Sequence, residues 1–321
     1  TPDKPDACML AALSGVGKVH GSNALYREHG LIMAGAVVAS GELSTASESG
    51  DGGTVALLGE SVKVVEAQVE ASGDRGGRIL IGGDFKGEGT LLTSAHTVVD
   101  AGSSLLTDGR YDAGGEIVVW ADDTAAVHGQ LSVRGATEGG SVETSAQYLD
   151  ISEVDIDVSG KAEGGSWVID PVDYEVVASG AGTNQINAAT IESTLDMGGD
   201  VVVMTSGAGT EEGDIQLQTS INQTNAASNG SLRFEGRRFV DNGHEINLAS
   251  SGQLTFDINS VNPEASPDSS SIQSAISAIG NVNGRRLIRL GAANYDFDQR
   301  IVVDTDVEIE GADVSTAVLA T

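Results

Sequence analysis

The sequence predicts an all-β fold of the solenoid type: a right-handed parallel β-helix with a few short side helices. Three observations favour it. Glycine pairs recur along the chain, short alternating strands lie between them, and the composition has 43 glycines, 5 prolines and 4% aromatic residues. Many glycines with few prolines suit many tight corners between short strands. Collagen is excluded, because it needs glycine at every third position and abundant proline.

The glycine pairs set a period. They open the phrases GGTVALLGE, GGRILIGGD, GGEIVVWADD, GGSVETSA, GGSWVIDP and GGDVVVMTSG, at steps of 24, 38, 25, 25 and 34 residues. Three steps are nearly equal, and the other two indicate one period plus an insertion. A single period cannot bury its apolar face, but stacked periods bury a continuous column. The predicted structural corners are Gly52, Gly53, Gly76, Gly77, Gly114, Gly115, Gly139, Gly140, Gly164 and Gly165.

Each period holds two or three short strands. Their alternation places Val, Ile and Leu on one face and Ser, Thr and Asp on the other. A β-sandwich is the alternative fold, but it would show hairpin turns every ~8–12 residues instead of a long period. We therefore interpret the glycine-rich stretch GGRILIGGDFKGEG at residues 76–89 as one of the repeated corners. No window has the phosphate-binding pattern GxxxxGK[ST].

Two segments break the strand pattern and are predicted as short helices. Ile272, Ile276 and Ile279 recur at helical spacing before Gly280. Ile191 and Leu195 share a helical face before Gly198. Such helices are amphipathic, with one apolar side for the core.

The charge and the cysteine count exclude several classes of function. The net charge is −30, from 47 acidic and 17 basic residues. This field repels phosphate backbones and anionic membrane surfaces, so no nucleic-acid partner is expected. Cys8 is the single cysteine, which rules out an intrachain disulfide. No run of 18 apolar residues occurs, so no membrane insertion is expected.

Several phrases, in their order, resemble the large haemagglutinin-like exoproteins of two-partner secretion. They are GGRILIGGDFKGEG, DAGGEIVVWADDTAAVHGQLSVRGATEGGSVETSAQYLDI and IDVSGKAEGGSWVIDP, within residues 50–215, and WADD and WVIDP are the most specific. These are adhesins of the filamentous haemagglutinin type, and the resemblance implies a right-handed parallel β-helix. The family's asparagine-proline-rich secretion domain is missing here. The segment from SIQSAISAIG onward is similar to the entry coil of pectate-lyase-like β-helices.

The domain organisation follows from these patterns. We expect an irregular segment or cap at residues 1–30 and the Gly-Gly-repeat β-helix at 31–180. The β-helix continues at 181–262 after a short helix. A linker, a short helix and pectate-lyase-like coils, truncated, fill residues 263–321. The chain is therefore expected to be an excerpt of a longer protein.

The resemblance implies a structural segment of a secreted bacterial surface adhesin or extracellular fibre, which attaches cells to hosts, surfaces or biofilms. The implied partners are a host or neighbouring-cell surface glycan or protein, and an outer-membrane transporter for the full-length protein. One alternative is a β-helical polysaccharide lyase or hydrolase. Another is a subunit of a self-assembling filament, because open coil ends are templates for end-to-end strand pairing.

The site prediction is sparse. No catalytic or cofactor-binding residue is predicted, because nothing marks the carboxylate sets that such lyases and hydrolases need. Calcium is considered at Asp155 and Asp157, which share a strand face, and at Asp122 and Asp123, although a solvated face is the simpler interpretation. Trp120 and Trp167 are expected to pack at strand ends rather than to stack on sugars.

Overall fold

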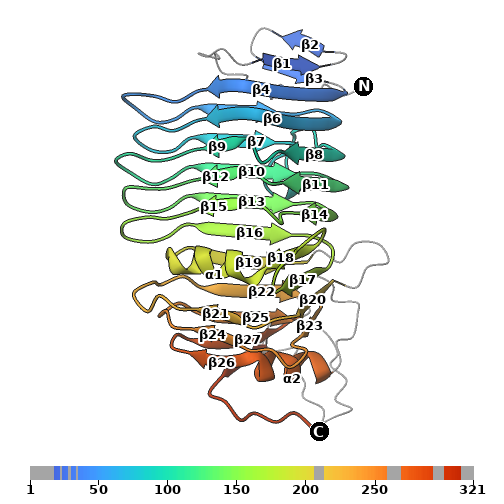
Figure 1. Cartoon of the computed structure of the whole chain (residues 1–321), viewed down its shortest axis with the longest axis vertical. Helices are drawn as coiled ribbons and strands as arrows, with labels where there is room; N and C mark the ends of the chain where they lie inside the picture. Colours follow the sequence, from blue (N-terminus) through green and yellow to red (C-terminus); the bar gives the residue numbers. More distant parts are fainter. Residues whose placement is uncertain are drawn as a thin grey trace. The chain divides into compact units, whose positions relative to one another are not determined.

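The computed structural model describes residues 18–21, 24–27, 30–33, 35–205, 213–258, 269–291 and 300–311. The chain divides into two compact units, Thr1–Val168 and Ile169–Thr321. Within each unit, parallel strands stack coil upon coil (Figure 1). The described ranges contain two α-helices and one short 3₁₀ helix, η1 (Phe85–Gly87), and are otherwise built from strands and turns. The predicted fold class, a parallel β-helix with short helices, is confirmed.

Unit 1 is three-sided. Its strands are β1 (Lys18–Gly21), β2 (Ala24–Arg27), β3 (Gly30–Met33), β4 (Ala36–Ser44), β5 (Thr54–Leu57), β6 (Ser61–Glu70), β7 (Arg78–Ile81), β8 (His96–Val99), β9 (Ser104–Leu106), β10 (Glu116–Trp120), β11 (Thr124–Val127), β12 (Gln130–Ser132), β13 (Ser141–Ser145), β14 (Tyr148–Asp150) and β15 (Asp155–Asp157), and β16 (Ser166–Asp170) begins in it. One face stacks β5, β7, β10 and β13. The long strands β4 and β6 pair in parallel and begin the other two faces, which continue as β8, β11, β14 and as β9, β12, β15.

The interior of unit 1 consists of apolar columns. Val55, Ile79, Ile117 and Val142 are successive register partners, and all four are buried. Equivalent positions recur at the strand spacing of about 4.8 Å, so each column is continuously packed. Since β7 pairs directly with β10, the 38-residue step of the sequence is a single coil. Its extra length is an outward insertion, residues 82–94, between β7 and β8.

Backbones of adjacent coils touch at the glycine corners. A Cβ atom on Gly77 would lie 2.0 Å from the Gly53 carbonyl oxygen, and one on Gly140 would lie 2.0 Å from the Gly115 carbonyl oxygen. Neither Gly77 nor Gly140 has a positive φ. Glycine is therefore required at these corners by close backbone approach and not by left-handed backbone geometry.

The edge of unit 1 at β4 is occupied. β1 pairs with β4 in antiparallel register, from Lys18 opposite Ser40 to Gly21 opposite Val37. β2 and β3 form a separate antiparallel pair. A parallel coil could therefore stack on β4 only by displacing β1.

Unit 2 repeats the plan with less regular coils. Its strands are β17 (Tyr174–Val177), β18 (Gln185–Asn187), β19 (Asp200–Met204), β20 (Asp214–Leu217), β21 (Ile221–Gln223), β22 (Leu232–Gly236), β23 (Arg238–Val240), β24 (Ile246–Leu248), β25 (Leu254–Ile258), β26 (Ile279–Val282), β27 (Arg286–Leu290) and β28 (Glu308–Gly311). They form the faces β18-β17-β20-β23, β19-β22-β25-β27-β28 and β21-β24-β26. Phe234, Phe239 and Phe256 fill the interior, with ring centroids 4.7 to 5.7 Å apart.

Both predicted helices are present. α1 (Ala188–Asp196) buries Ile191 and Leu195, and Gly198 follows it with a φ of 88°. α2 (Ser269–Ala278) buries Ile272 and Ile276, while Ile279 begins β26. No described helix is both long and apolar enough to cross a bilayer. The expected linker near residue 263 lies outside the described residues, and the expected domain boundaries stay predictions.

The corner geometry predicts the cost of one added methyl group. Gly140→Ala places a Cβ inside contact distance of the Gly115 backbone, and this overpacking should lower the free energy of unfolding by about 1–3 kcal/mol. Gly102→Ala is the matched control, because its nearest neighbour would be a Glu66 side-chain carbon at 3.5 Å. Urea unfolding of both variants measures the difference. Equal stability of the two variants would contradict the close-approach explanation.

Candidate functional site

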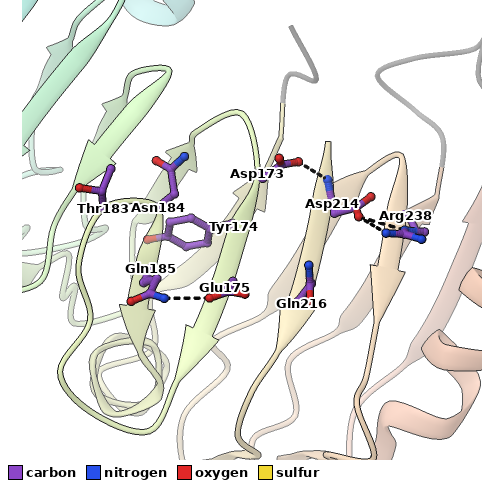
Figure 2. Close-up of a pocket in the computed structure, with 9 residues that line it drawn as sticks. All are labelled: Asp173, Tyr174, Glu175, Thr183, Asn184, Gln185, Asp214, Gln216 and Arg238. Atoms are coloured by element: carbon purple, nitrogen blue, oxygen red, sulfur yellow. Dashed lines mark hydrogen bonds and ion pairs between the residues drawn. The ribbon is translucent and has the colours of Figure 1, made fainter. Parts of the chain in front are cut away.

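A concave site occurs in the described part of each unit. In unit 2 a groove of about 400 Å³ crosses four neighbouring strands of one face (Figure 2). In unit 1 a cavity of about 280 Å³ lies beside the 82–94 insertion. The first is lined mainly by polar side chains, and the second has a buried carboxylate in its wall.

The groove is a grid of outward-facing side chains. Residues two apart on a strand point the same way, and register partners lie side by side. Glu175 is thus flanked by Gln185 on β18 and Gln216 on β20. Asp214 is the register partner of Arg238 on β23. The wall is completed by Asp173, Tyr174, Thr183 and Asn184.

Most carboxylates of the groove are already held by the protein. The Glu175 carboxylate accepts hydrogen bonds from Gln185 Nε2 at 2.8 Å and from Gln218 Nε2 at 3.2 Å. Asp214, 5% exposed, is paired with Arg238 and lies 3.5 Å from Arg237 Nη2. Asp173 accepts the backbone N–H of Asp214 at 2.7 Å. These contacts fix the side chains before any ligand arrives (Figure 2).

Free hydrogen-bonding capacity remains at the centre and at one end of the groove. The side chains of Gln216 and Thr183 make no hydrogen bond within the described part of the chain. An amide offers two donors and an acceptor, and a hydroxyl offers one donor and an acceptor. Tyr174 is 1% exposed and presents no ring face for stacking. The groove therefore suits a hydroxyl-rich, uncharged ligand rather than an aromatic or anionic one.

In unit 1 the 82–94 insertion covers one outer face of the coils. Ala56, Leu58, Leu80 and Val118 form a buried apolar cluster on that face, with Leu91 and Trp120 packed against it. Two glycines bring the insertion flat against the indole. A Cβ on Gly87 would lie 2.4 Å from Trp120 Cζ2, and one on Gly83 would lie 2.9 Å from Trp120 Cδ1. The stretch at 76–89 is thus a corner only at Gly76 and Gly77, and our prediction was wrong for the rest of it.

Glu143 interrupts this outer apolar column. Leu80, Val118 and Glu143 are successive register partners, so the carboxylate takes the place of an aliphatic side chain. Glu143 is 1% exposed. Both of its oxygens accept the Lys86 backbone N–H at 3.0 Å, and Oε1 also accepts the Ser145 hydroxyl at 2.8 Å. A backbone donor of the insertion thus holds a buried carboxylate of the next coil.

Burial raises the pKa of Glu143, and the negative charge of Glu116 raises it further, against the lowering effect of its hydrogen bonds and of Lys86. Glu116 is itself paired with Arg78, whose Nη2 also contacts Asp84 at 3.1 Å. No ion pair joins Glu143 to a basic side chain in the described ranges. It is therefore a buried carboxylate without a cationic partner, which is a costly arrangement.

The predicted calcium candidates have protein partners. Asp122 accepts hydrogen bonds from Trp120 Nε1 at 2.9 Å and Thr93 Oγ1 at 2.8 Å, which anchors the end of the insertion. Asp123 lies 3.6 Å from His96 Nδ1. On β15, exposed Asp155 meets Gln130 at 3.4 Å, and Asp157 accepts the Ser159 N–H at 3.0 Å. The described residues contain no group of three His, Cys, Asp or Glu side chains placed to hold a metal.

The two tryptophans have different positions. Trp167 is fully buried, and its Nε1 donates to Thr144 Oγ1 at 3.1 Å. Trp120 lies on the outer face beneath the insertion. Two of the basic residues near the end of the described chain contact acids: Arg285 pairs with Glu308 and Glu310, and Arg289 lies 3.6 Å from Glu310.

Sequence reasoning missed Glu143 and the groove. The signal for Glu143 was present, since aligning GGRILIGG, GGEIVVWA and GGSVETSA by their glycine pairs places Glu143 in the column of Leu80 and Val118. The groove had no such signal, because its strands follow irregular steps. No known protein family matches the sequence, and no curated protein matches it.

The raised pKa of Glu143 predicts a pH-dependent difference between wild type and Glu143→Gln. A carboxyl group whose folded-state pKa exceeds its unfolded value of about 4.3 binds more protons when folded, so its contribution to stability falls as pH rises through that window. The stability of wild type minus that of Glu143→Gln should therefore decrease from pH 4 upward and level off above the folded-state pKa. Urea unfolding across this range measures it. A difference that increases with pH would contradict the assignment.

Proposed function

We propose that this chain is a structural and display segment of a secreted bacterial surface adhesin, of the haemagglutinin-like, two-partner secretion type. In the full-length protein an outer-membrane transporter would export it to the cell surface. The resemblance of the glycine-pair phrases to that family supports the proposal. The β-solenoid architecture is compatible with it, since solenoids expose long, regular surfaces built on a repetitive core.

The observation that carries the proposal is the separation of scaffold and surface. Inside each unit, register partners form apolar columns, such as Val55 to Val142 in unit 1 and the three phenylalanines of unit 2. Outside, the strands of the unit 2 groove present polar side chains in a fixed row. The outward row of Gln185, Glu175 and Gln216 is the part best suited to contact a ligand.

We assign the unit 2 groove to a neutral surface glycan. Sugar hydroxyls donate and accept hydrogen bonds, the amides and hydroxyls that line the groove do both, and its carboxylates accept. The four strands span about 14 Å at a spacing near 4.8 Å, which is enough for a short oligosaccharide laid across the coils. The net charge of −30 disfavours sulfated or uronic-acid glycans.

A polysaccharide lyase or hydrolase is the alternative, because Asp173 and Glu175 both line the same groove. This alternative is disfavoured because both carboxylates already accept hydrogen bonds from the protein. Asp173 accepts the Asp214 N–H, and Glu175 accepts two glutamine side-chain amides. A self-assembling filament is the third possibility. The antiparallel strand β1 argues against it at the β4 edge, because that edge is already paired.

Gln216→Ala tests the groove, because it removes a side chain that supports nothing else in the described structure. Loss of one neutral hydrogen bond should weaken glycan binding by about 1 kcal/mol, or roughly 5-fold. Gln130→Ala, an outward amide on β12, is the matched control and should leave binding unchanged. Neutral and acidic oligosaccharides immobilised on an array provide the measurement.

The same array, analysed for newly released reducing or unsaturated ends, separates binding from catalysis. Binding without cleavage is the outcome expected for an adhesin. Cleavage that is abolished by Glu175→Gln would replace this proposal with the polysaccharide-active enzyme. Equal binding by wild type and Gln216→Ala would remove the groove from the contact.

A further inference from the structure

The unit 1 cavity beside the insertion has no role in the proposed display function. Its wall contains Phe85, Val118, Val168, Ser141, Ser166 and Glu143. Its volume of about 280 Å³ is at the small end of ligand sites, which begin near 300 Å³. It combines an apolar surface with one buried carboxylate that has no cationic partner.

We propose that this cavity binds a primary alkylammonium group, with the ammonium at the Glu143 carboxylate and the alkyl stem along Val118, Val168 and Phe85. The carboxylate retains a free acceptor site for it. Oε1 is used by Ser145 and Lys86, whereas Oε2 accepts only the Lys86 N–H. A carboxylate oxygen can accept two hydrogen bonds, so Oε2 has a lone pair left.

Two further hydrogen-bond acceptors lie on the wall of the same cavity. Ser141 and Ser166 line the same cavity, and their hydroxyls make no hydrogen bond with described residues. Together with Glu143 Oε2 they supply three acceptors. Phe85, which is 42% exposed, also lines the cavity, and the Lys86 ammonium lies 5.6 Å from its ring centroid, a cation–π contact.

Other ligand classes fit less well. A metal ion needs several charged ligands, and the second carboxylate of the cavity, Glu116, is paired with Arg78. An anion would meet two carboxylates. A planar guanidinium needs two adjacent free acceptor sites, and Glu143 Oε1 is already doubly occupied.

The charged groups around Glu143 set the expected pH dependence. Glu116 on β10 and burial favour the protonated acid, while Lys86 of the insertion favours the carboxylate. Arg78 on β7 is held by Glu116 and Asp84 and does not reach Glu143. Because the ammonium binds the ionised form, affinity should rise about tenfold per pH unit below the pKa of Glu143 and be constant above it.

The test is a titration of the whole chain with n-butylammonium, followed by the ¹³C chemical shift of the Glu143 carboxyl carbon. We expect saturable binding that lowers the pKa of that carboxyl group. Glu143→Gln keeps the size and the acceptor for Lys86 N–H, and it should weaken binding at least tenfold and abolish the pH dependence. Glu153→Gln, an exposed glutamate of the same unit, should bind as wild type does.

Two further ligands complete the design. n-Butanol, which has the stem but not the charge, should not compete. Nα-acetyl-lysine N-methylamide distinguishes the sources of the group: tighter binding than n-butylammonium indicates a lysine side chain of a protein partner, and weaker binding indicates a free amine. Equal affinity for wild type and Glu143→Gln, or equal competition by n-butanol, would overturn the proposal.

Discussion

The structure depends on register between successive coils. Apart from the antiparallel pairs formed by β1, β2 and β3, the strands pair in parallel with their counterparts one coil away, so a residue's side chain lies directly over the same position of its neighbour. This pairing brings backbones so close at the corners that Gly77 and Gly140 have no space for a Cβ. The apolar columns and the outward rows both follow from it. Stability in such an arrangement is a sum over neighbouring coils rather than a property of one central core.

Register also explains where function can arise. In a column of equivalent positions, a residue of different chemistry is surrounded by the same neighbours as the residues it replaces. Glu143 is such a case, since it lies where Leu80 and Val118 are apolar and is buried by the same insertion. Its carboxylate therefore cannot be solvated as that of a surface glutamate would be, and burial raises its pKa. In the groove the opposite holds, because Glu175 is half-buried and its carboxylate is held by the side-chain amides of Gln185 and Gln218.

The period could be read from the sequence, but its exceptions could not. Glycine pairs mark the coil corners of unit 1 because only glycine permits that backbone approach, so corner spacing reports coil length directly. The 38-residue step predicted an insertion. It did not predict that the insertion folds back over β10, where Gly83 and Gly87 pack against Trp120. Which outward residues become buried depends on that cover, and Glu143 was missed for this reason. In unit 2, α1 and longer turns break the spacing, so the adjacency of Asp173, Asp214 and Arg238 is a product of tertiary pairing alone.

The central claim is that coils are equivalent, stacked modules, and the most direct test is to remove one. Ser141 N donates to Gly115 O and Ser166 N donates to Gly140 O, both at 2.9 Å, so residues 141–165 form one complete coil between equivalent points. Deleting 141–165 should preserve parallel register. The test compares this variant with a deletion of residues 141–152, which removes half a coil. Urea unfolding and far-ultraviolet circular dichroism would be measured for both. The account predicts cooperative unfolding and unchanged β-structure per residue for the full-coil deletion, and loss of both for the half-coil deletion. Equal disruption by the two deletions would contradict it.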